Sequence, residues 1–210
     1  MGSRSYAESL GLRIGSGMPG VRFVPIAFLV VLASAAAGHP GALWAAMAAL
    51  VALLLLLQFR LWDDLADVAG DRGGHAAAFR AAAWVAFTAT FALLAVLSGA
   101  GAVAAFLALC AFYGAWYTQP PQARAGLVGA HIVVLKYPAF VLLLAPRPLD
   151  GTRTALSCAA IYFACLAYEL IHDAAHRSRR GAPALAAAAL VAVGCTVGAL
   201  AVIVLREALA

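Results

Sequence analysis

The chain has 210 residues, of which 65% are hydrophobic and only 11% are charged, and its mean hydropathy is +0.96. A soluble domain is about a quarter charged, so this composition leaves too little polar sequence to cover a water-exposed surface. The formal net charge of +5 does not indicate nucleic-acid binding, because the basic residues lie beside apolar segments, where membrane topology accounts for them. The composition excludes a soluble protein and predicts one embedded in a lipid bilayer.

Seven apolar segments follow one another along the chain and define the expected helices. They lie at about residues 23–38, 41–59, 76–97, 101–117, 126–145, 154–172 and 182–205. Most approach the ~20 residues that an α-helix needs to cross the hydrocarbon core. Their apolar residues are continuous and do not alternate, which argues against a β-barrel. We therefore expect an all-α, polytopic membrane helix bundle of about seven transmembrane helices.

The ends of these segments carry clear turn signals. Gly38-His39-Pro40-Gly41 predicts a tight turn, and the segments 99–101 and 146–151 mark later turns in the same way. Pro138 is expected to kink the fifth helix. Residues 1–22 lack a signal-peptide cleavage site. We interpret them as a cytoplasmic N-terminal segment that precedes a single transmembrane domain, residues 23–210.

The basic residues predict the orientation in the membrane. With a cytoplasmic N-terminus, ten arginines fall inside, three fall outside and Lys136 lies within a span. The inside set is Arg4, Arg13, Arg22, Arg60, Arg72, Arg80, Arg124, Arg177, Arg179 and Arg180, and the outside set is Arg147, Arg153 and Arg206. The positive-inside rule favours this topology. We expect an integral protein of the bacterial inner (plasma) membrane.

The four cysteines, Cys110, Cys158, Cys165 and Cys195, all lie in apolar runs. They form no CxxC pair, so the sequence indicates neither a disulfide framework nor a thiolate metal site. We interpret them as small apolar packing residues.

Six of the nine acidic residues gather in two clusters, at the expected cytoplasmic ends of the second and sixth helices. They are Asp63, Asp64, Asp67, Asp71, Glu169 and Asp173. If the second helix continues past residue 59, the last three acids of its cluster share one face, and Arg60 lies on that face one turn earlier. In the second cluster, Glu169, Asp173 and His176 follow i, i+4, i+7 spacing.

Such like charges repel one another unless cations compensate them, and acidic residues at a membrane boundary are functional candidates. Carboxylates without cysteine suit Mg²⁺, which binds through a few carboxylates together with substrate phosphates. Two facing clusters would hold Mg²⁺ around a diphosphate and ease its departure. The alternative is a solvated acidic loop, with Arg60, Arg72 and Arg177 as counter-ions.

Two further polar features lie at or near membrane depth. Lys136 is near the middle of the fifth segment, where a charge is costly unless it faces a cavity or a partner. We interpret it as a contact to a substrate anion or a cavity acid, with snorkelling as the alternative. His172 and His176 have a zinc-binding spacing, for which His131 is the only nearby third ligand. The other interpretation is an interfacial His172 and a His176 that acts as a base or as a donor to diphosphate.

Three segments of the chain resemble the UbiA superfamily of intramembrane prenyltransferases. Segment 63–71, D-D-L-A-D-V-A-G-D, is similar to the N-D-x-x-D-x-x-x-D motif, with Asp in place of the usual Asn. Segment 169–173, E-L-I-H-D, looks like the second acidic motif, D-x-x-x-D. Segment 117–121, Y-T-Q-P-P, followed by Arg124, is similar to a Tyr-Ser-x-Pro-Pro segment after helix 4. The resemblance covers roughly residues 20–205.

The resemblance implies an all-α bundle around a cavity in which Mg²⁺ and a polyprenyl diphosphate bind, and in which a membrane-accessible acceptor, often aromatic, attacks the C1 carbon. It implies catalytic, metal-binding roles for Asp64, Asp67, Asp71, Glu169 and Asp173. It implies diphosphate contacts for Arg72, Arg124 and Tyr117. Arg60, Lys136 and His176 complete the substrate-binding candidates. The family has nine helices, so a second copy or a partner chain would complete this bundle.

We therefore expect a Mg²⁺-dependent prenyltransferase. One alternative is a terpene cyclase of the same type, in which the chain's own double bond attacks. Another is a non-catalytic carrier or transporter of a divalent ion or a lipid diphosphate. The CDP-alcohol phosphotransferases are excluded, because their Asp-Gly-x-x-Ala-Arg element is absent from the sequence.

Overall fold

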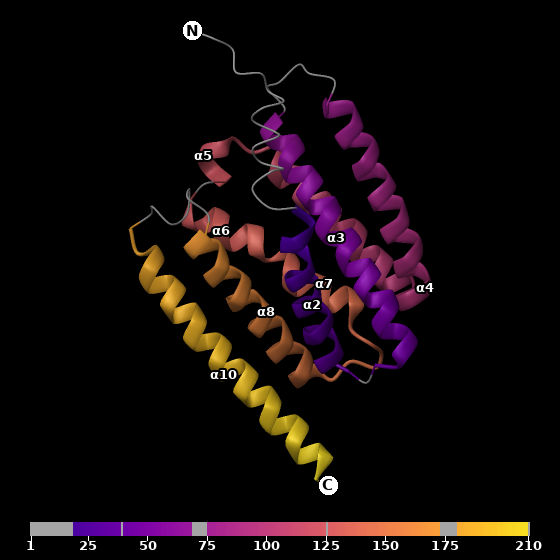
Figure 1. The fold of residues 1–210 in the computed structure, drawn as a ribbon, viewed down its shortest axis with the longest axis vertical. Coiled ribbons are helices and arrows are strands. Elements are labelled where there is room, and N and C mark those ends of the chain that lie inside the picture. Colours follow the sequence, from indigo (N-terminus) through magenta and orange to yellow (C-terminus); the bar gives the residue numbers. More distant parts are fainter. Residues whose placement is uncertain (1–18, 39, 69–74, 125, 173–179, 210) are drawn as a thin grey trace.

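A computed structural model describes residues 19–38, 40–68, 75–124, 126–172 and 180–209. Within these ranges every regular element is a helix (Figure 1). The helices are α2 (Pro19–Ala36), α3 (Ala42–Val68), α4 (His75–Tyr117), α5 (Pro121–Arg124), α6 (Leu127–Val134), α7 (Lys136–Leu144), α8 (Gly151–His172) and α10 (Ala182–Ala208). The predicted all-α class is confirmed.

Several of these helices are long and apolar enough to cross a bilayer. Among the described residues there are five such spans: Leu43–Ala66, Arg80–Tyr117, Leu127–Leu144, Gly151–His172 and Ala182–Ala208. A shorter apolar helix, Val24–Ala36, precedes them. The chain is accordingly an integral membrane protein. The total of seven spans stays a prediction.

α4 contains the turn that was predicted at the glycines of segment 99–101. Gly99 has φ 77° and ψ −172°, a conformation that is essentially restricted to glycine. The rings of Phe87 and Phe106 stack with their centroids 5.4 Å apart, whereas a straight helix would separate these positions by about 28 Å. The chain therefore folds back at Gly99, and α4 consists of two antiparallel arms.

Two helix boundaries differ from the sequence-based expectation. α3 was expected to end at residue 59, but it continues to Val68, so that Asp63, Asp64 and Asp67 lie on helical backbone as the shared-face argument requires. The fifth segment was expected to be one helix, but it is divided at Leu135 into α6 and α7. The predicted kink near Pro138 is confirmed, because proline lacks the N–H group that would bond to the carbonyl four residues earlier.

The turn between α2 and α3 packs against the turn between α7 and α8. Trp44 Nε1 donates a hydrogen bond to the carbonyl oxygen of Leu144, at 3.0 Å. A Cβ atom on Gly38 would lie 2.8 Å from the carbonyl oxygen of Pro146, so this approach requires glycine. These contacts tie the helices together at the end of the bundle where the chain's C-terminus lies (Figure 1). The acidic end of α3 lies at the opposite end.

Candidate functional site

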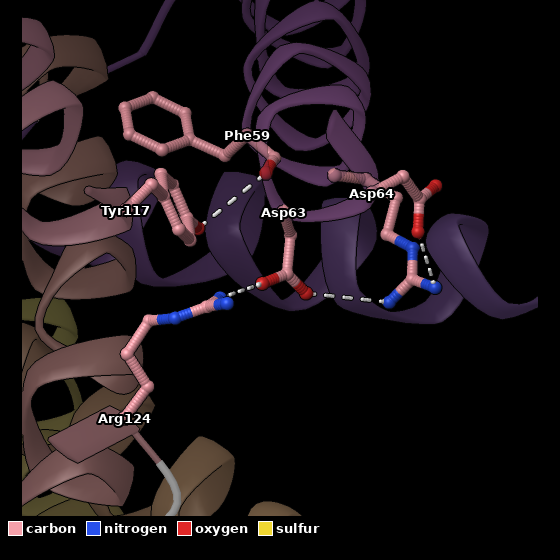
Figure 2. A network of polar contacts seen from close by, with 6 residues as sticks. Phe59, Asp63, Asp64, Tyr117 and Arg124 are labelled. Carbon is pink, nitrogen blue, oxygen red and sulfur yellow. Dashed lines mark hydrogen bonds and ion pairs between the residues drawn. The ribbon is translucent and has the colours of Figure 1, made fainter. Parts of the chain in front are cut away.

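Asp63 lies between two arginines that come from different helices. On α3, Nη1 of Arg60 is 3.6 Å from Oδ2 of Asp63, and Nη2 of Arg60 is 2.8 Å from Oδ1 of Asp64. These two pairs follow from helical i, i+3 and i, i+4 spacing. The third pair joins Arg124 of α5 to Asp63, with Nη1 3.7 Å from Oδ1. Asp63 therefore links the end of α3 to α5 (Figure 2).

The short helix α5 is held in place by close backbone packing. A Cβ atom on Gly129 of α6 would lie 1.9 Å from the carbonyl oxygen of Arg124, so only glycine allows this contact. The Arg124 side chain is only 11% exposed. Tyr117, at the end of α4, points toward the same part of α3, and its hydroxyl donates to the carbonyl oxygen of Phe59 at 3.5 Å (Figure 2). The Tyr-Thr-Gln-Pro-Pro segment and Arg124 thus lie against the acidic end of α3.

Tyr113 accounts for the break between α6 and α7 together with Pro138. Its hydroxyl donates a hydrogen bond to the carbonyl oxygen of Ile132, and the backbone N–H of Lys136 also interacts with that hydroxyl. In an uninterrupted helix this N–H would bond directly to this carbonyl, four residues earlier. A side chain inserted into the hydrogen-bond ladder is one of the recognised causes of a helix kink. Tyr113 thereby fixes Lys136 at the first position of α7.

Lys136 connects the two acidic clusters. Its side chain is buried, at 8% exposure, which contradicts the alternative that it snorkels toward the lipid interface. The ammonium interacts electrostatically with Asp63 of α3 and with Glu169 of α8, as well as with Arg60 and Cys165. Asp63 and Glu169 are far apart in the sequence, yet both act on this one buried cation. The acidic ends of α3 and α8 therefore converge.

An aromatic cluster lies beneath these charges. The ring of Phe59 contacts Tyr113, with centroids 5.2 Å apart, and Phe140, with centroids 5.3 Å apart. All three side chains are fully buried. They come from α3, α4 and α7, so the charged end rests on an apolar floor to which three helices contribute.

Sequence reasoning missed three residues of the site. Tyr113 forms the contacts described above. Tyr137 interacts electrostatically with Glu169 and with Cys165, and Cys165 with Lys136. Cys165 was interpreted only as a packing residue. A signal was present, because Tyr113 and Cys165 each lie one helical turn before a candidate, Tyr117 and Glu169 respectively, and so share its helix face.

The structure brings together part of the predicted set. The candidates that it places at the site are Arg60, Asp64, Tyr117, Arg124, Lys136 and Glu169. Asp71, Arg72, Asp173 and His176 lie outside the described residues, and Asp67 lies on α3 without a described side chain. In the described ranges, no three His, Cys, Asp or Glu side chains are grouped to hold a metal ion. Of the magnesium set, Asp64 and Glu169 have described side chains.

The histidines of the zinc alternative do not gather within the described part of the chain. His131 hydrogen bonds through Nδ1 to the hydroxyl of Tyr162, at 2.5 Å. His172 is exposed at the end of α8, with its ring 4.4 Å from that of Tyr168.

The fold and the site together define an integral membrane helix bundle in which charged side chains of both signs gather at one end of α3, α7 and α8. No protein-family model matches the chain, and neither a curated protein nor a solved structure matches it. Its function is therefore inferred from the site itself.

Proposed function

We propose that the protein is a Mg²⁺-dependent intramembrane prenyltransferase, which moves a prenyl group from a polyprenyl diphosphate to an acceptor in the membrane. The observation that carries this proposal is the position of Lys136, buried between the acidic ends of α3 and α8 and acting on Asp63 and Glu169 together. Buried charge at membrane depth is costly and marks binding or transport sites. A loop of solvated acids with simple counter-ions would not require a buried lysine between two helices.

Three cations in the site suit a diphosphate. Arg60 and Arg124 present guanidinium groups on either side of Asp63, and Lys136 adds an ammonium. Arginine binds phosphate oxygens through a planar, bidentate fork, while lysine acts as a point charge. A bound diphosphate would compete with Asp63 for both guanidinium groups. The arginines would then hold the diphosphate, and the Asp63 carboxylate would become available for other contacts.

The carboxylates fit magnesium by their chemistry. Asp64 and Glu169 supply hard oxygen donors from the two helices, and Mg²⁺ prefers such ligands together with substrate phosphates. We assign the remaining positions of the set to Asp67, Asp71 and Asp173 by the motif spacing. When bound, Mg²⁺ neutralises the charge that develops on the departing diphosphate.

The apolar floor suits the prenyl chain. Phe59, Tyr113 and Phe140 lie directly under the charged residues, and aromatic faces attract cations in desolvated sites. The allylic carbon gains positive charge as its bond to the diphosphate oxygen breaks. These rings would therefore stabilise the transition state as well as cover the hydrocarbon.

We further propose the bacterial inner membrane as the location, with a cytoplasmic N-terminus and seven crossings. The two arms of α4 on either side of Gly99 supply the extra crossings. α10 packs along α8 at the edge of the bundle (Figure 1). A second copy or a partner chain there would supply the helices that a nine-helix bundle has and this chain lacks.

The test is the fate of radiolabelled geranylgeranyl diphosphate and farnesyl diphosphate, incubated with the protein in lipid nanodiscs, Mg²⁺ and a membrane extract. We expect Mg²⁺-dependent release of diphosphate and a labelled, acceptor-linked product. A labelled hydrocarbon formed without an acceptor would identify a cyclase. Binding without consumption of the diphosphate would identify a carrier and overturn the proposal.

A pair of variants links turnover to the acidic motif. Asp67→Asn should reduce turnover by at least about 100-fold, the scale on which groups that stabilise transition-state charge act. Asp150→Asn is the matched control at the opposite end of the bundle. Asp150 caps α8 by accepting a hydrogen bond from the Arg153 N–H at 2.7 Å, and asparagine caps equally well. Equal turnover by the two variants would contradict the proposed role of the motif.

A further inference from the structure

A second polar pair lies away from the charged end of the bundle. Nδ1 of His131, on α6, is 2.5 Å from the hydroxyl of Tyr162, on α8. The two rings are nearly parallel, with an interplanar angle of 22°. Both side chains are half-buried. The proposed diphosphate site uses neither of them.

The pair lies on the same face of α8 as the proposed diphosphate site. Tyr162, Cys165 and Glu169 are at i, i+3 and i+7, which places them on one side of a helix. Cys165 and Glu169 both interact electrostatically with Lys136. Tyr162 precedes Glu169 by two turns, or about 10 Å along the helix axis. It lies near the middle of the span Gly151–His172, so the pair is at hydrocarbon depth on a track that leads to the charged end.

The chemistry of His131 favours a ligand. Ionisable side chains at membrane depth are expensive and normally mark a functional site. The hydrogen bond to Tyr162 uses Nδ1, which leaves Nε2 for another group. When the proton is on Nδ1, the imidazole donates to the tyrosine oxygen and Nε2 is a hydrogen-bond acceptor. Such a nitrogen selects a ligand that carries an O–H group.

The surroundings of the pair are open to lipid. On α6, Val128 is 70% exposed and Leu135 is 47% exposed. These positions flank His131 on the same helix, so a molecule dissolved in the bilayer can reach the half-buried imidazole from the side. Water-soluble substrates would not use this route.

We propose that His131 and Tyr162 form the acceptor subsite, which binds the hydroxyl group of a lipid-soluble phenol. This inference rests on the proposed prenyl transfer for the word acceptor, but the binding site itself does not depend on turnover. The separation of about 10 Å along α8 accommodates one aromatic ring, with the remaining gap close to the near-attack separation of about 3 Å between reacting atoms. His131 Nε2 would accept the phenolic O–H and thereby orient the ring toward the diphosphate end.

The test uses a photoreactive phenol, 4-(trifluoromethyldiazirinyl)phenol, and its methyl ether, which lacks the O–H group. Each is irradiated with the protein in nanodiscs, and the labelled residues are mapped by mass spectrometry. We expect the phenol to label α6 and α8 around His131 and Tyr162 at least fivefold more than the ether does. His131→Phe and Tyr162→Phe should each remove this preference. Tyr168→Phe, at a half-exposed position on the same helix, should retain it.

His131→Gln keeps a hydrogen-bonding group near the position of Nε2 and should retain part of the preference, so it replaces His131→Phe if that variant does not fold. Equal labelling by phenol and ether, or a preference that persists in both His131 variants and in Tyr162→Phe, would overturn the inference. Phenol-selective labelling in a protein that consumes no prenyl diphosphate would instead refute the proposed enzymatic function and leave the hydroxyl-binding site standing.

Discussion

Arg124 and Asp63 meet across two helices, with Nη1 of Arg124 3.7 Å from Oδ1 of Asp63. The arginine comes from the short helix after α4, and the aspartate begins the acidic motif on α3. An ion pair of this length at a partly exposed site contributes little to stability. Its position matters more, because it keeps a guanidinium group at the place where we propose that the diphosphate binds.

Arg124→Lys should weaken the binding of geranylgeranyl diphosphate by about ten- to hundredfold, since a hydrogen bond to a charged group is worth about 1.5–3 kcal/mol. Lysine keeps the charge but loses the planar fork. Arg80→Lys is the matched control, because Arg80 is exposed near the start of α4. Binding is measured with the radiolabelled ligand in nanodiscs. Similar affinities for the two variants would exclude Arg124 from the diphosphate site.

Lys136→Met should change the affinities for cation and anion in opposite directions. Removing the buried ammonium leaves Asp63 and Glu169 without the cation on which both act. Mg²⁺ binding in the absence of diphosphate should therefore strengthen, by about tenfold on simple electrostatic grounds, while diphosphate binding weakens. Lys136→Arg keeps the charge and should leave Mg²⁺ affinity near that of the wild type. Calorimetric titration measures both; weaker Mg²⁺ binding to Lys136→Met would be inconsistent with this arrangement.

Gly99→Ala should destabilise the protein, because φ 77° and ψ −172° are available essentially to glycine and cost about 1–3 kcal/mol for other residues. The thermal midpoint should fall by at least about 2 °C. Gly101→Ala is the control: a Cβ atom there meets nothing within 4 Å, and alanine favours a helix over glycine. Equal midpoints for the two variants would argue against a reversal of the chain at Gly99.

The seven-span topology predicts that the two ends of the chain lie on opposite sides of the membrane. Alkaline phosphatase fused after Ala210 should be active, because that enzyme folds only outside the cytoplasm. The same reporter inserted after Arg180 should be inactive, since the surrounding arginines favour the cytoplasmic side. An inactive C-terminal fusion, present at normal levels, would require an even number of crossings.

The helices were largely predictable, because they depend on local properties. Continuous apolar runs set their number and class, and Gly99 and Pro138 marked a reversal and a break. The end of α3 was wrong because hydropathy falls at residue 59, whereas the helix continues through charged residues to Val68. The backbone hydrogen bonds do not depend on side-chain polarity, and the pair between Arg60 and Asp64 supports this last part of the helix.

The candidate site was predictable only in its charges. Clustered acids and a lysine within a span are visible in any reading of the sequence. The insertion of Tyr113 between Ile132 and Lys136 depends on how α4 packs against α7, which no local pattern encodes. The pair between His131 and Tyr162 likewise arises from the crossing of α6 over α8.

The convergence of the two acidic helix ends is tested most directly by a double-mutant cycle between Asp63→Asn and Glu169→Gln. The measured quantity is Mg²⁺-dependent binding of geranylgeranyl thiolodiphosphate, an analogue that does not react. If both carboxylates act on one bound group, their effects should be coupled by at least about 1 kcal/mol, beyond the roughly 0.3–0.5 kcal/mol within which independent sites add. Additive effects would show that α3 and α8 do not share a binding site.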